Sequence, residues 1–324
     1  MLFRKETIEG WAENIRESTT TEDKEAILLS LRSYSFHFIN GASKKPPTKP
    51  DSPAQHIEAV REGVSVLWHM FIETAKVFDH DDAFQEKLIQ SLLWTKEYDA
   101  LRRAFHRDET DELDWDAYGF AESLQAAWEP LLTGDDPVEQ KQDRLNLAAF
   151  SAKLMSVGVC GDLIVSTALW YLRQTLEMDH DEERTISLLP ASMAWVDHTR
   201  HKPLALSITS SEPPQEEGEI PALAAPGSLA QNNGVADPGF SLQRWLFWRR
   251  RFQELSHSAN PEVAKKAKEG FMRMVHCGYD MEYDVPGEAR FMERLQTAMG
   301  EELIRSGKES VEGDDINIKV DWID

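Results

Sequence analysis

The sequence predicts an all-α protein: a bundle or layered array of about ten helices with one long Pro- and Gly-rich insert. Three observations lead to this prediction. Helix start signals recur along the chain, apolar residues fall at helical spacing, and convincing runs of alternating apolar and polar residues, which indicate strands, are absent. With 324 residues, the chain is long enough to bury a sizeable core.

Helix starts are marked where a residue with a capping side chain precedes proline. An oxygen at the N-cap accepts hydrogen bonds from the otherwise unpaired amides of the first turn, and proline at the next position has no amide to leave unpaired. The three pairs of this kind are Ser52-Pro53, Asp136-Pro137 and Asn260-Pro261. We therefore expect helices at about 53–78, 137–157 and 261–277.

Apolar residues on single helical faces mark the remaining helices. Phe84, Leu88 and Leu92 lie four residues apart, as do Leu101 and Phe105 farther along. Each stretch therefore presents one apolar face to a core. Further helices are expected near 6–18, 22–40, 117–129, 162–178, 188–200, 241–256 and 287–306.

Two segments interrupt this pattern. Residues 41–52 are rich in proline and lysine, and residues 203–239 contain six prolines, several glycines and an acidic run. Because proline lacks an amide donor and restricts its neighbours, residues 41–52 are not expected to hold a helix, and residues 203–239 are expected to form a long surface excursion or a disordered loop. The chain then divides into N-terminal helices with a linker (1–52), a helical body (53–202), a flexible insert (203–239), C-terminal helices packed on the body (240–306) and an acidic tail (307–324).

The charge balance is strongly acidic. A formal net charge of −22 favours solubility and weakens long-range attraction to nucleic acids and anionic membranes. The two cysteines, Cys160 and Cys277, are not in a CxxC pattern, and the sequence shows neither an apolar signal core at its start nor a run long enough to span a bilayer. We expect a cytoplasmic protein with no membrane contact and no disulfide-linked partner.

Familiar catalytic signatures are absent from the sequence. It contains no GxSxG elbow, Walker loop or Rossmann glycine fingerprint. His198 and His201 have a spacing that metal ligands use, but no third ligand is apparent, and the same residues fit a polar helix end. The acidic stretches around His80 and His180 are interpreted as solvated loops. We therefore expect no metal and no other cofactor.

Tryptophan is abundant, with ten copies. Aromatic residues at helical spacing are usually core residues, although they can also line a pocket for a flat or cationic ligand. The candidate substrate-binding residues, which all belong to apolar helical faces, are Trp170, Trp195, Trp245 and Trp248.

The segment 244–252 combines four arginines with several large apolar side chains. On a helix, Trp245, Trp248 and Phe252 face inward, and the arginines fall mostly outside that stripe. Two interpretations stay open: the arginines pair with the chain's many carboxylates, or they form a phosphate-binding strip together with downstream lysines. The residues of this basic strip are Arg249, Arg250, Arg251, Lys265, Lys266 and Lys268.

A resemblance to a family rests on three segments taken together. They are 145–154 followed by 168–177, then 189–196, and finally 241–249. Their order and spacing resemble an uncharacterised family of fungal helical proteins that is catalogued only as a domain of unknown function. The resemblance spans roughly 53–275. It implies an all-α fold and an ascomycete source, and it brings no established catalytic residues.

Some fungal proteins of this general appearance sit in natural-product gene clusters. The chain is similar to one such group, the arginine-containing cyclodipeptide synthases, in lacking a recognisable synthetase motif. This kinship would imply an enzyme of secondary metabolism that joins aminoacyl groups from aminoacyl-tRNAs and needs no ATP. The basic strip would hold the tRNA, and carboxylates would bind the arginine side chain. The candidate catalytic residues are Asp162, Arg173, Trp195 and Asp197.

Two other functions stay open on the sequence. One is a non-catalytic helical module that binds a protein partner, which the missing motifs and the aromatic-rich faces favour. The other is a small-molecule isomerase or cyclase with a Trp-lined cavity. A deep cavity of about 300–1,000 Å³ lined by tryptophan, arginine and carboxylates would count against the interaction module.

Overall fold

The computed structural model describes residues 2–18, 20–42, 53–105, 118–133, 138–159, 161–199, 201–210, 224–285 and 287–307. Within these ranges the protein is all-α, as predicted. They contain thirteen α-helices and one π-helical segment, and none of their residues lies in a strand.

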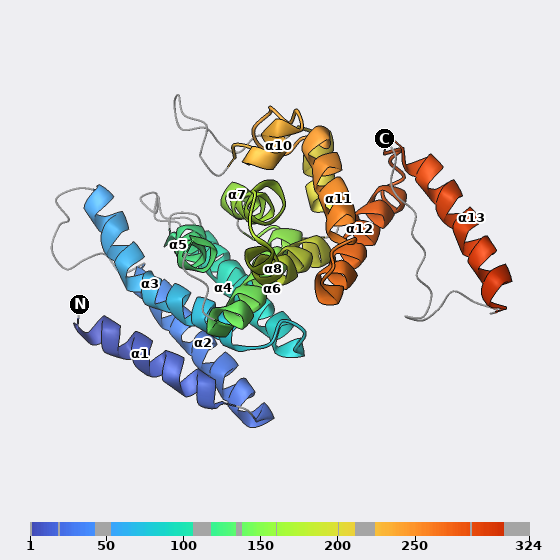
Figure 1. Cartoon of the computed structure of the whole chain (residues 1–324). Helices are drawn as coiled ribbons and strands as arrows, with labels where there is room; N and C mark the ends of the chain where they lie inside the picture. The colour runs from blue at the N-terminus through green and yellow to red at the C-terminus, as the bar shows by residue number, and fades with distance from the viewer. Residues whose placement is uncertain are drawn as a thin grey trace.

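Six helices from the N-terminal half surround a first hydrophobic core. They are α1 (Leu2–Glu17), α2 (Thr21–Ala42), α3 (Pro53–Val77), α4 (Ala83–Phe105), α5 (Phe120–Thr133) and α6 (Val138–Val157). α3 packs against α1, α2, α5 and α6, so it lies at the centre of this group (Figure 1). Trp68 on α3, Trp128 on α5 and Phe150 on α6 are fully buried there.

The remaining elements build a second hydrophobic core beside the first. They are α7 (Gly161–Leu172), the π-helix η2 (Arg173–Glu177), α8 (Glu182–Thr199), α9 (Lys202–Ile208), α10 (Ser228–Asn232), α11 (Leu242–Leu255), α12 (Pro261–Asp280) and α13 (Glu288–Ser306). α8 packs against both α6 and α12, and it therefore joins the two cores. α13 lies at the outer edge (Figure 1), where Phe291 makes an edge-to-face contact with Phe271 of α12 at 5.1 Å.

Local sequence signals account for the helix starts in this region. The Oδ1 atom of Asn260 accepts hydrogen bonds from the amides of Glu262 at 3.0 Å and Val263 at 3.3 Å, which confirms the predicted cap of α12. Ser241 caps α11 in the same way. The other two predicted capping residues, Ser52 and Asp136, lie outside the described residues.

The apolar pattern predicted one part of α4 correctly and another part wrongly. Phe84, Leu88 and Leu92 are buried, as expected from their spacing. Leu101 and Phe105, near the end of the same helix, are exposed. At that end a different face of the helix is covered, where Asp99 and Arg102 are buried, and a search for apolar spacing cannot identify a polar buried face.

The helix predicted over 162–178 is interrupted by the π-helical turn of η2, which directly continues α7. A π turn adds one residue to a helical turn and therefore changes the direction of the side chains that follow. Thr175 stabilises the turn by donating to the carbonyl of Tyr171 at 3.1 Å. Glu177 ends the turn with its side chain completely buried, facing α11.

The described parts of the predicted insert over 203–239 contain two short helices and residues of the second core. Residues 202–208 form α9, because Pro203 lies in the first turn, where its missing amide costs no hydrogen bond. Residues 224–239 contain α10 and bury Ala224, Ala230 and Val235 in the second core. Residues 211–223, the linker at 43–52 and the tail from 308 onward lie outside the described residues.

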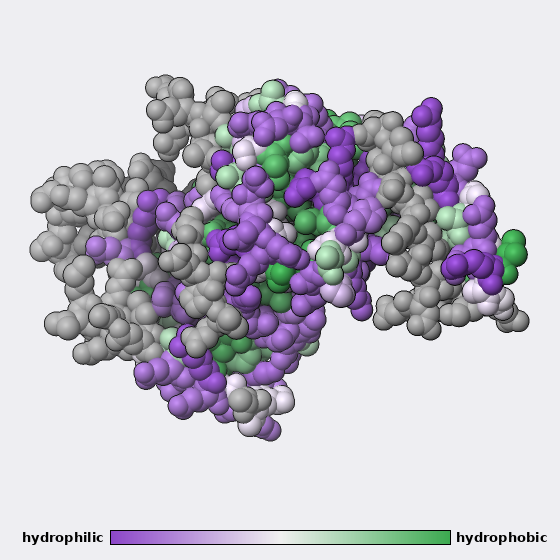
Figure 2. All heavy atoms as spheres, viewed as in Figure 1, coloured by the Kyte–Doolittle hydropathy of each residue, from purple (hydrophilic) through white to green (hydrophobic). Residues whose placement is uncertain are grey.

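Polar residues cover most of the face seen in Figure 2, with apolar residues visible in the recesses between them. This distribution agrees with the acidic composition of the chain. Among the described helices, none has both the length and the apolar character that crossing a membrane requires.

Gly270 allows α12 to approach α8 and α11 closely. A Cβ atom at this position would lie 2.6 Å from Met193 Sδ and 2.8 Å from the ring of Phe252. We expect Gly270→Ala to lower the free energy of unfolding by about 1–2 kcal/mol, because the neighbouring side chains must move to avoid overlap. Urea unfolding followed by circular dichroism measures this change.

Gly300→Ala on α13 is the matched control. A Cβ atom there meets no other atom within 4 Å, so the substitution should stabilise the protein slightly, by about 0.5–1 kcal/mol, through helix propensity. Equal effects of the two substitutions would contradict the close packing at Gly270.

Candidate functional site

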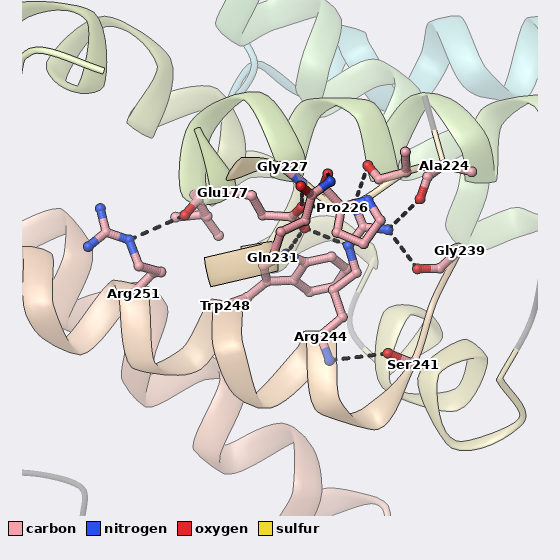
Figure 3. A network of polar contacts seen from close by, with 12 residues as sticks. Glu177, Ala224, Pro226, Gly227, Gln231, Gly239, Ser241, Arg244, Trp248 and Arg251 are labelled. Carbon is pink, nitrogen blue, oxygen red and sulfur yellow. Dashed lines mark hydrogen bonds and ion pairs between the residues drawn. The ribbon is translucent and has the colours of Figure 1, made fainter. Parts of the chain in front are cut away.

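The arginine-rich segment forms α11, and its first arginine is turned into the protein. Arg244 and Glu177 of η2 are both 0% exposed and form a bidentate ion pair. The distance from Nε to Oε1 is 2.6 Å, and that from Nη2 to Oε2 is 2.9 Å. Figure 3 shows this pair between η2 and α11, with the loop that contains Ala224 and Gly239 beside it.

Further hydrogen bonds satisfy both charged groups. Glu177 also accepts from the indole of Trp248 at 2.6 Å and from the amide of Gly227 at 2.7 Å. Nη1 of Arg244 donates to the carbonyls of Ala224 at 2.7 Å and Gly239 at 2.8 Å. Removing one member of such a pair leaves the other charge buried without a partner, which is strongly destabilising. The pair ties the loop at 224–239 to η2 and α11.

The predicted basic strip is therefore divided by the fold. Arg249 is only 1% exposed, so the expectation that it lies at the surface for phosphate contact is wrong. Arg251 is half-buried, donates to the Leu176 carbonyl at 3.2 Å and pairs with Glu254. Arg250 and Lys266 are half-buried, and Lys265 and Lys268 are exposed on α12. Arg244, predicted to lie mostly outside the apolar stripe, is also corrected to the interior.

A cavity of about 450 Å³ opens next to this ion pair. The cavity is lined by residues of α7, α8, α9, α11 and α12 and of the turn before α9. These residues supply aromatic, sulfur, imidazole and charged groups to its wall. This volume lies within the range of small-molecule sites in proteins. We call this space the tryptophan cavity, because its wall includes Trp195, Trp245 and Trp248.

Two of the three indoles in the wall have no hydrogen-bond partner among the described residues. They are Trp195 Nε1 and Trp245 Nε1, and both atoms are buried. The third indole, that of Trp248, donates to Glu177 and is fixed by the ion pair. Because these two nitrogen atoms are buried, the indoles line the cavity with other atoms of their rings, and the wall offers aromatic surface to an occupant.

Charged groups lie on another side of the tryptophan cavity. Arg273 Nε and Asp197 Oδ1 are 3.1 Å apart, and the Arg273 side chain is largely exposed. Burial raises the pKa of Asp197 above its ordinary value, and Arg273 opposes this increase. His276 and Asp280, both exposed, follow on α12. The cavity therefore has an apolar aromatic side and a charged side.

A sulfur–imidazole pair completes the wall. His201 Nδ1 and Cys277 Sγ are 3.5 Å apart, within hydrogen-bond reach for sulfur. Cys277 is buried and is not part of a disulfide. His201 lies in the turn between α8 and α9, whereas Cys277 lies in the last turn of α12.

The structure brings together only some of the residues predicted from the sequence. Trp195, Trp245, Trp248 and Asp197 line one cavity, whereas Trp170 belongs to the first core and is not part of the cavity wall. Arg173, in η2, is half-buried and is not part of the wall either, and the side chain of Asp162 lies outside the described residues.

The metal-like histidine spacing gains no further ligand in the structure. In the described residues, the group whose ligand atoms could share an ion is Asp79, His80 and Asp81, on an exposed loop. Exposed acidic groups of this kind are common without a metal. It remains a prediction that the protein uses no metal and no other cofactor.

Sequence reasoning missed His201, Cys277 and Arg273 as members of one site. A signal was available on α12, where Arg273, Cys277 and Asp280 follow one another at i, i+4 and i+7 on a single helical face. His201, however, lies 76 residues from Cys277 in the chain, and a helical pattern cannot relate residues so far apart.

Comparisons with known proteins give two matches. Residues 68–252 match the family described as "Protein of unknown function (DUF3632)". The chain is also 24% identical over 242 residues to "Oxopyrrolidines biosynthesis cluster protein G" of Penicillium oxalicum, a match that covers 66% of this chain and 65% of that protein, slightly less than two thirds of its length. No solved structure matches the chain. These matches confirm the resemblance to an uncharacterised family and lend no support to kinship with cyclodipeptide synthases.

Proposed function

The chain belongs to the DUF3632 family of proteins of unknown function, and we propose that it is a small-molecule enzyme of fungal secondary metabolism, an isomerase or cyclase, that holds its substrate in the tryptophan cavity. The cavity itself carries this proposal. Its volume of about 450 Å³ suits a small organic molecule, and its wall combines flat aromatic surfaces with a few polar groups.

The hydrogen-bond chemistry of the wall supports a ligand that carries acceptor oxygens. Arg273 lines the cavity, and its side chain is largely exposed. A carbonyl oxygen would accept from this donor, and the ring that bears it would lie against the aromatic faces.

The name of the similar Penicillium protein agrees with such a ligand. That name refers to the biosynthesis cluster for oxopyrrolidines, which are five-membered nitrogen rings that carry a carbonyl group. A lactam of this class is compact, partly apolar and rich in acceptors. We therefore take an oxopyrrolidine-type lactam as the substrate class to test first.

The other two functions have less support. Arg249 of the basic strip is buried and the net charge is −22, so the tRNA-dependent formation of arginine-containing cyclodipeptides has less support. A cavity with three tryptophans, an arginine and two carboxylates in its wall is also not a feature that a non-catalytic interaction module needs.

Binding to two matched ligands tests the proposal. We expect a 2-oxopyrrolidine that carries an aromatic ring to bind the protein, as measured by calorimetry. Trp195→Phe and Trp245→Phe should each weaken this binding about fivefold, or about 1 kcal/mol, because the smaller ring offers less aromatic surface to the ligand. The same 2-oxopyrrolidine without its aromatic ring should lose less affinity in these variants.

Trp94→Phe provides the control, since Trp94 is exposed on α4 and is not part of the cavity wall. Its affinity for both ligands should equal that of the unmodified protein. Equal losses for both ligands in the cavity variants would refute the proposed role of the indole rings. Absence of lactam binding in the unmodified protein would remove the proposed substrate class.

A further inference from the structure

Cys277 and His201 place two chemically active groups in the wall of the same cavity. Cys277 is 6% exposed, and its sulfur lies 3.5 Å from His201 Nδ1. Both residues line the cavity, although they come from separate elements of the fold. Trp195 and Trp245, with their buried indole N–H groups, lie in this wall as well.

The position of Cys277 favours the neutral thiol over the thiolate. The residue is buried in the last turn of α12, at the end of the helix that carries the negative pole of the dipole. A thiol in such a place is a weak nucleophile unless an adjacent base removes its proton. His201 is the group within reach, and its Nδ1 accepts this proton when the ring carries its own hydrogen on Nε2.

We propose that Cys277 is a nucleophile and His201 its general base, and that the pair adds reversibly to an α,β-unsaturated carbonyl compound in the tryptophan cavity. This inference rests on the proposed function, since it assumes that the cavity holds a small molecule. It adds the reacting group of that molecule, a carbon–carbon double bond conjugated to the carbonyl.

The step is balanced without an oxidant or reductant. The thiol proton moves to Nδ1 of His201, and the sulfur electron pair forms a bond to the β-carbon of the ligand. The π electrons of the double bond move onto the carbonyl oxygen, which gives an enolate. The guanidinium group of Arg273, which also lines the cavity and is largely exposed, is a donor that can stabilise this oxygen.

The covalent adduct allows two kinds of reaction, an isomerisation and a cyclisation. In the adduct, the bond between the α- and β-carbons is single and can rotate, and the enolate carbon can attack a second electrophile in the same ligand. Expulsion of the sulfur from the enolate re-forms the double bond, and the thiolate takes the proton back from His201, which completes an isomerisation. In a cyclisation, His201 first gives its proton to the anion formed on the second electrophile. It then removes the proton of the α-carbon, and the sulfur leaves in the same way. Either outcome agrees with the reaction classes named above.

A metal site is the main competing interpretation of a Cys–His pair. Among the described residues, no third ligand atom joins Cys277 and His201 at a distance suited to one ion. Structural zinc sites use four ligands and catalytic zinc sites three. The pair is therefore better explained as a nucleophile with its base.

Labelling with a small enone tests the inference. The full-length protein is incubated with 2-cyclopentenone, and the adduct is located by intact-mass and peptide mass spectrometry. We expect one adduct, on Cys277, forming faster in the folded protein than in the same protein unfolded in guanidinium chloride. Cys277→Ser should abolish it, and His201→Gln should slow it by about 100-fold, a typical contribution of general base catalysis.

Cys160→Ser is the matched control, because it removes the other cysteine of the chain and should leave the adduct on Cys277 unchanged. Circular dichroism and thermal melting verify that each variant is folded. The inference is overturned if folded Cys277 reacts more slowly than in the unfolded chain, or if His201→Gln reacts at the unmodified rate.

Competition separates this inference from the proposed function. If the aromatic 2-oxopyrrolidine binds but Cys277 does not react with the enone, the nucleophile is refuted and the cavity remains a lactam site. If Cys277 reacts rapidly but a saturating concentration of the lactam does not protect it, the pair is active and the lactam class is refuted. Rapid reaction with full protection supports both.

Discussion

Glu177→Gln is expected to lower the free energy of unfolding by about 3–5 kcal/mol, because it leaves a buried guanidinium group without its counter-charge. Arg244 and Glu177 are both fully buried, and their two hydrogen bonds are 2.6 and 2.9 Å long. Glutamine keeps the size of the side chain but removes the negative charge and one acceptor oxygen. Urea unfolding at neutral pH measures the loss.

The same substitution should also change the tryptophan cavity. Glu177 Oε1 accepts from the indole of Trp248 at 2.6 Å, and Trp248 lines the cavity. Glu177 also accepts a hydrogen bond from the amide of Gly227, which holds the loop at 224–239 against η2. We therefore expect weaker ligand binding in Glu177→Gln even under conditions where the protein is folded.

Two variants make this prediction specific. Glu254→Gln removes a half-exposed ion pair with Arg251 on the same helix and should cost less than about 1 kcal/mol. Replacing both partners with apolar residues, as in Glu177→Leu with Arg244→Met, should recover much of the stability lost in Glu177→Gln, because no buried charge remains. If Glu177→Gln is no worse than Glu254→Gln, the ion pair does not stabilise the fold as described.

This ion pair also shows where reasoning from sequence ends. Glu177 and Arg244 are 67 residues apart, and both belong to segments that were correctly predicted to be helical. Periodicity assigns charged residues to the solvent face, so Arg244 and Arg249 were expected outside. The π turn of η2 directs Glu177 into the interior, and a buried carboxylate then favours a buried arginine.

The helices themselves could be predicted because their signals are local. The side chain of Asn260 bonds amides only two and three residues away, so the start of α12 is encoded within one turn. Prolines were given too much weight between 203 and 239. Pro203 occupies the first turn of α9, and Pro226 is buried next to Glu177 and Arg244 (Figure 3).

The candidate site was predicted in part for the same reason. Trp195, Trp245 and Trp248 could be identified as residues of apolar helical faces, but the cavity that they share depends on how α8, α11 and α12 meet. Cys277 and His201 each belong to a local pattern, but no pattern relates the two residues, and only the tertiary structure brings their side chains together.

We expect the protein to become less stable as the pH falls from about 6.5 to about 4, because His198 takes up a proton more readily in the unfolded than in the folded protein. The histidine lies half-buried on α8, and its pKa is lowered from 6.5 to about 4. Burial is the main cause, followed by the positive charge of Lys153 and by His80, while Glu86 and Asp81 oppose the decrease.

The sign follows from proton linkage. Because the pKa of His198 is lower in the folded than in the unfolded protein, the unfolded state binds more protons between these two pH values. Stability is therefore retained above pH 6.5 and lost as the pH falls toward 4, and below this value the loss is complete. For a side chain that is only half-buried, we expect a loss of about 1–3 kcal/mol.

Urea unfolding at several pH values between 7.5 and 4 measures this dependence. His198→Gln, which cannot take up a proton, should show a smaller loss of stability over the window than the unmodified protein. His37→Gln, at an exposed position on α2, controls for the removal of a histidine in general. Burial also raises the pKa values of Asp143 and Asp197, and protonation of these two carboxyl groups stabilises the folded protein as the pH falls. The difference between His198→Gln and the unmodified protein therefore isolates the contribution of His198. Identical pH dependences for His198→Gln and the unmodified protein would show that this histidine is protonated as easily in the folded as in the unfolded chain.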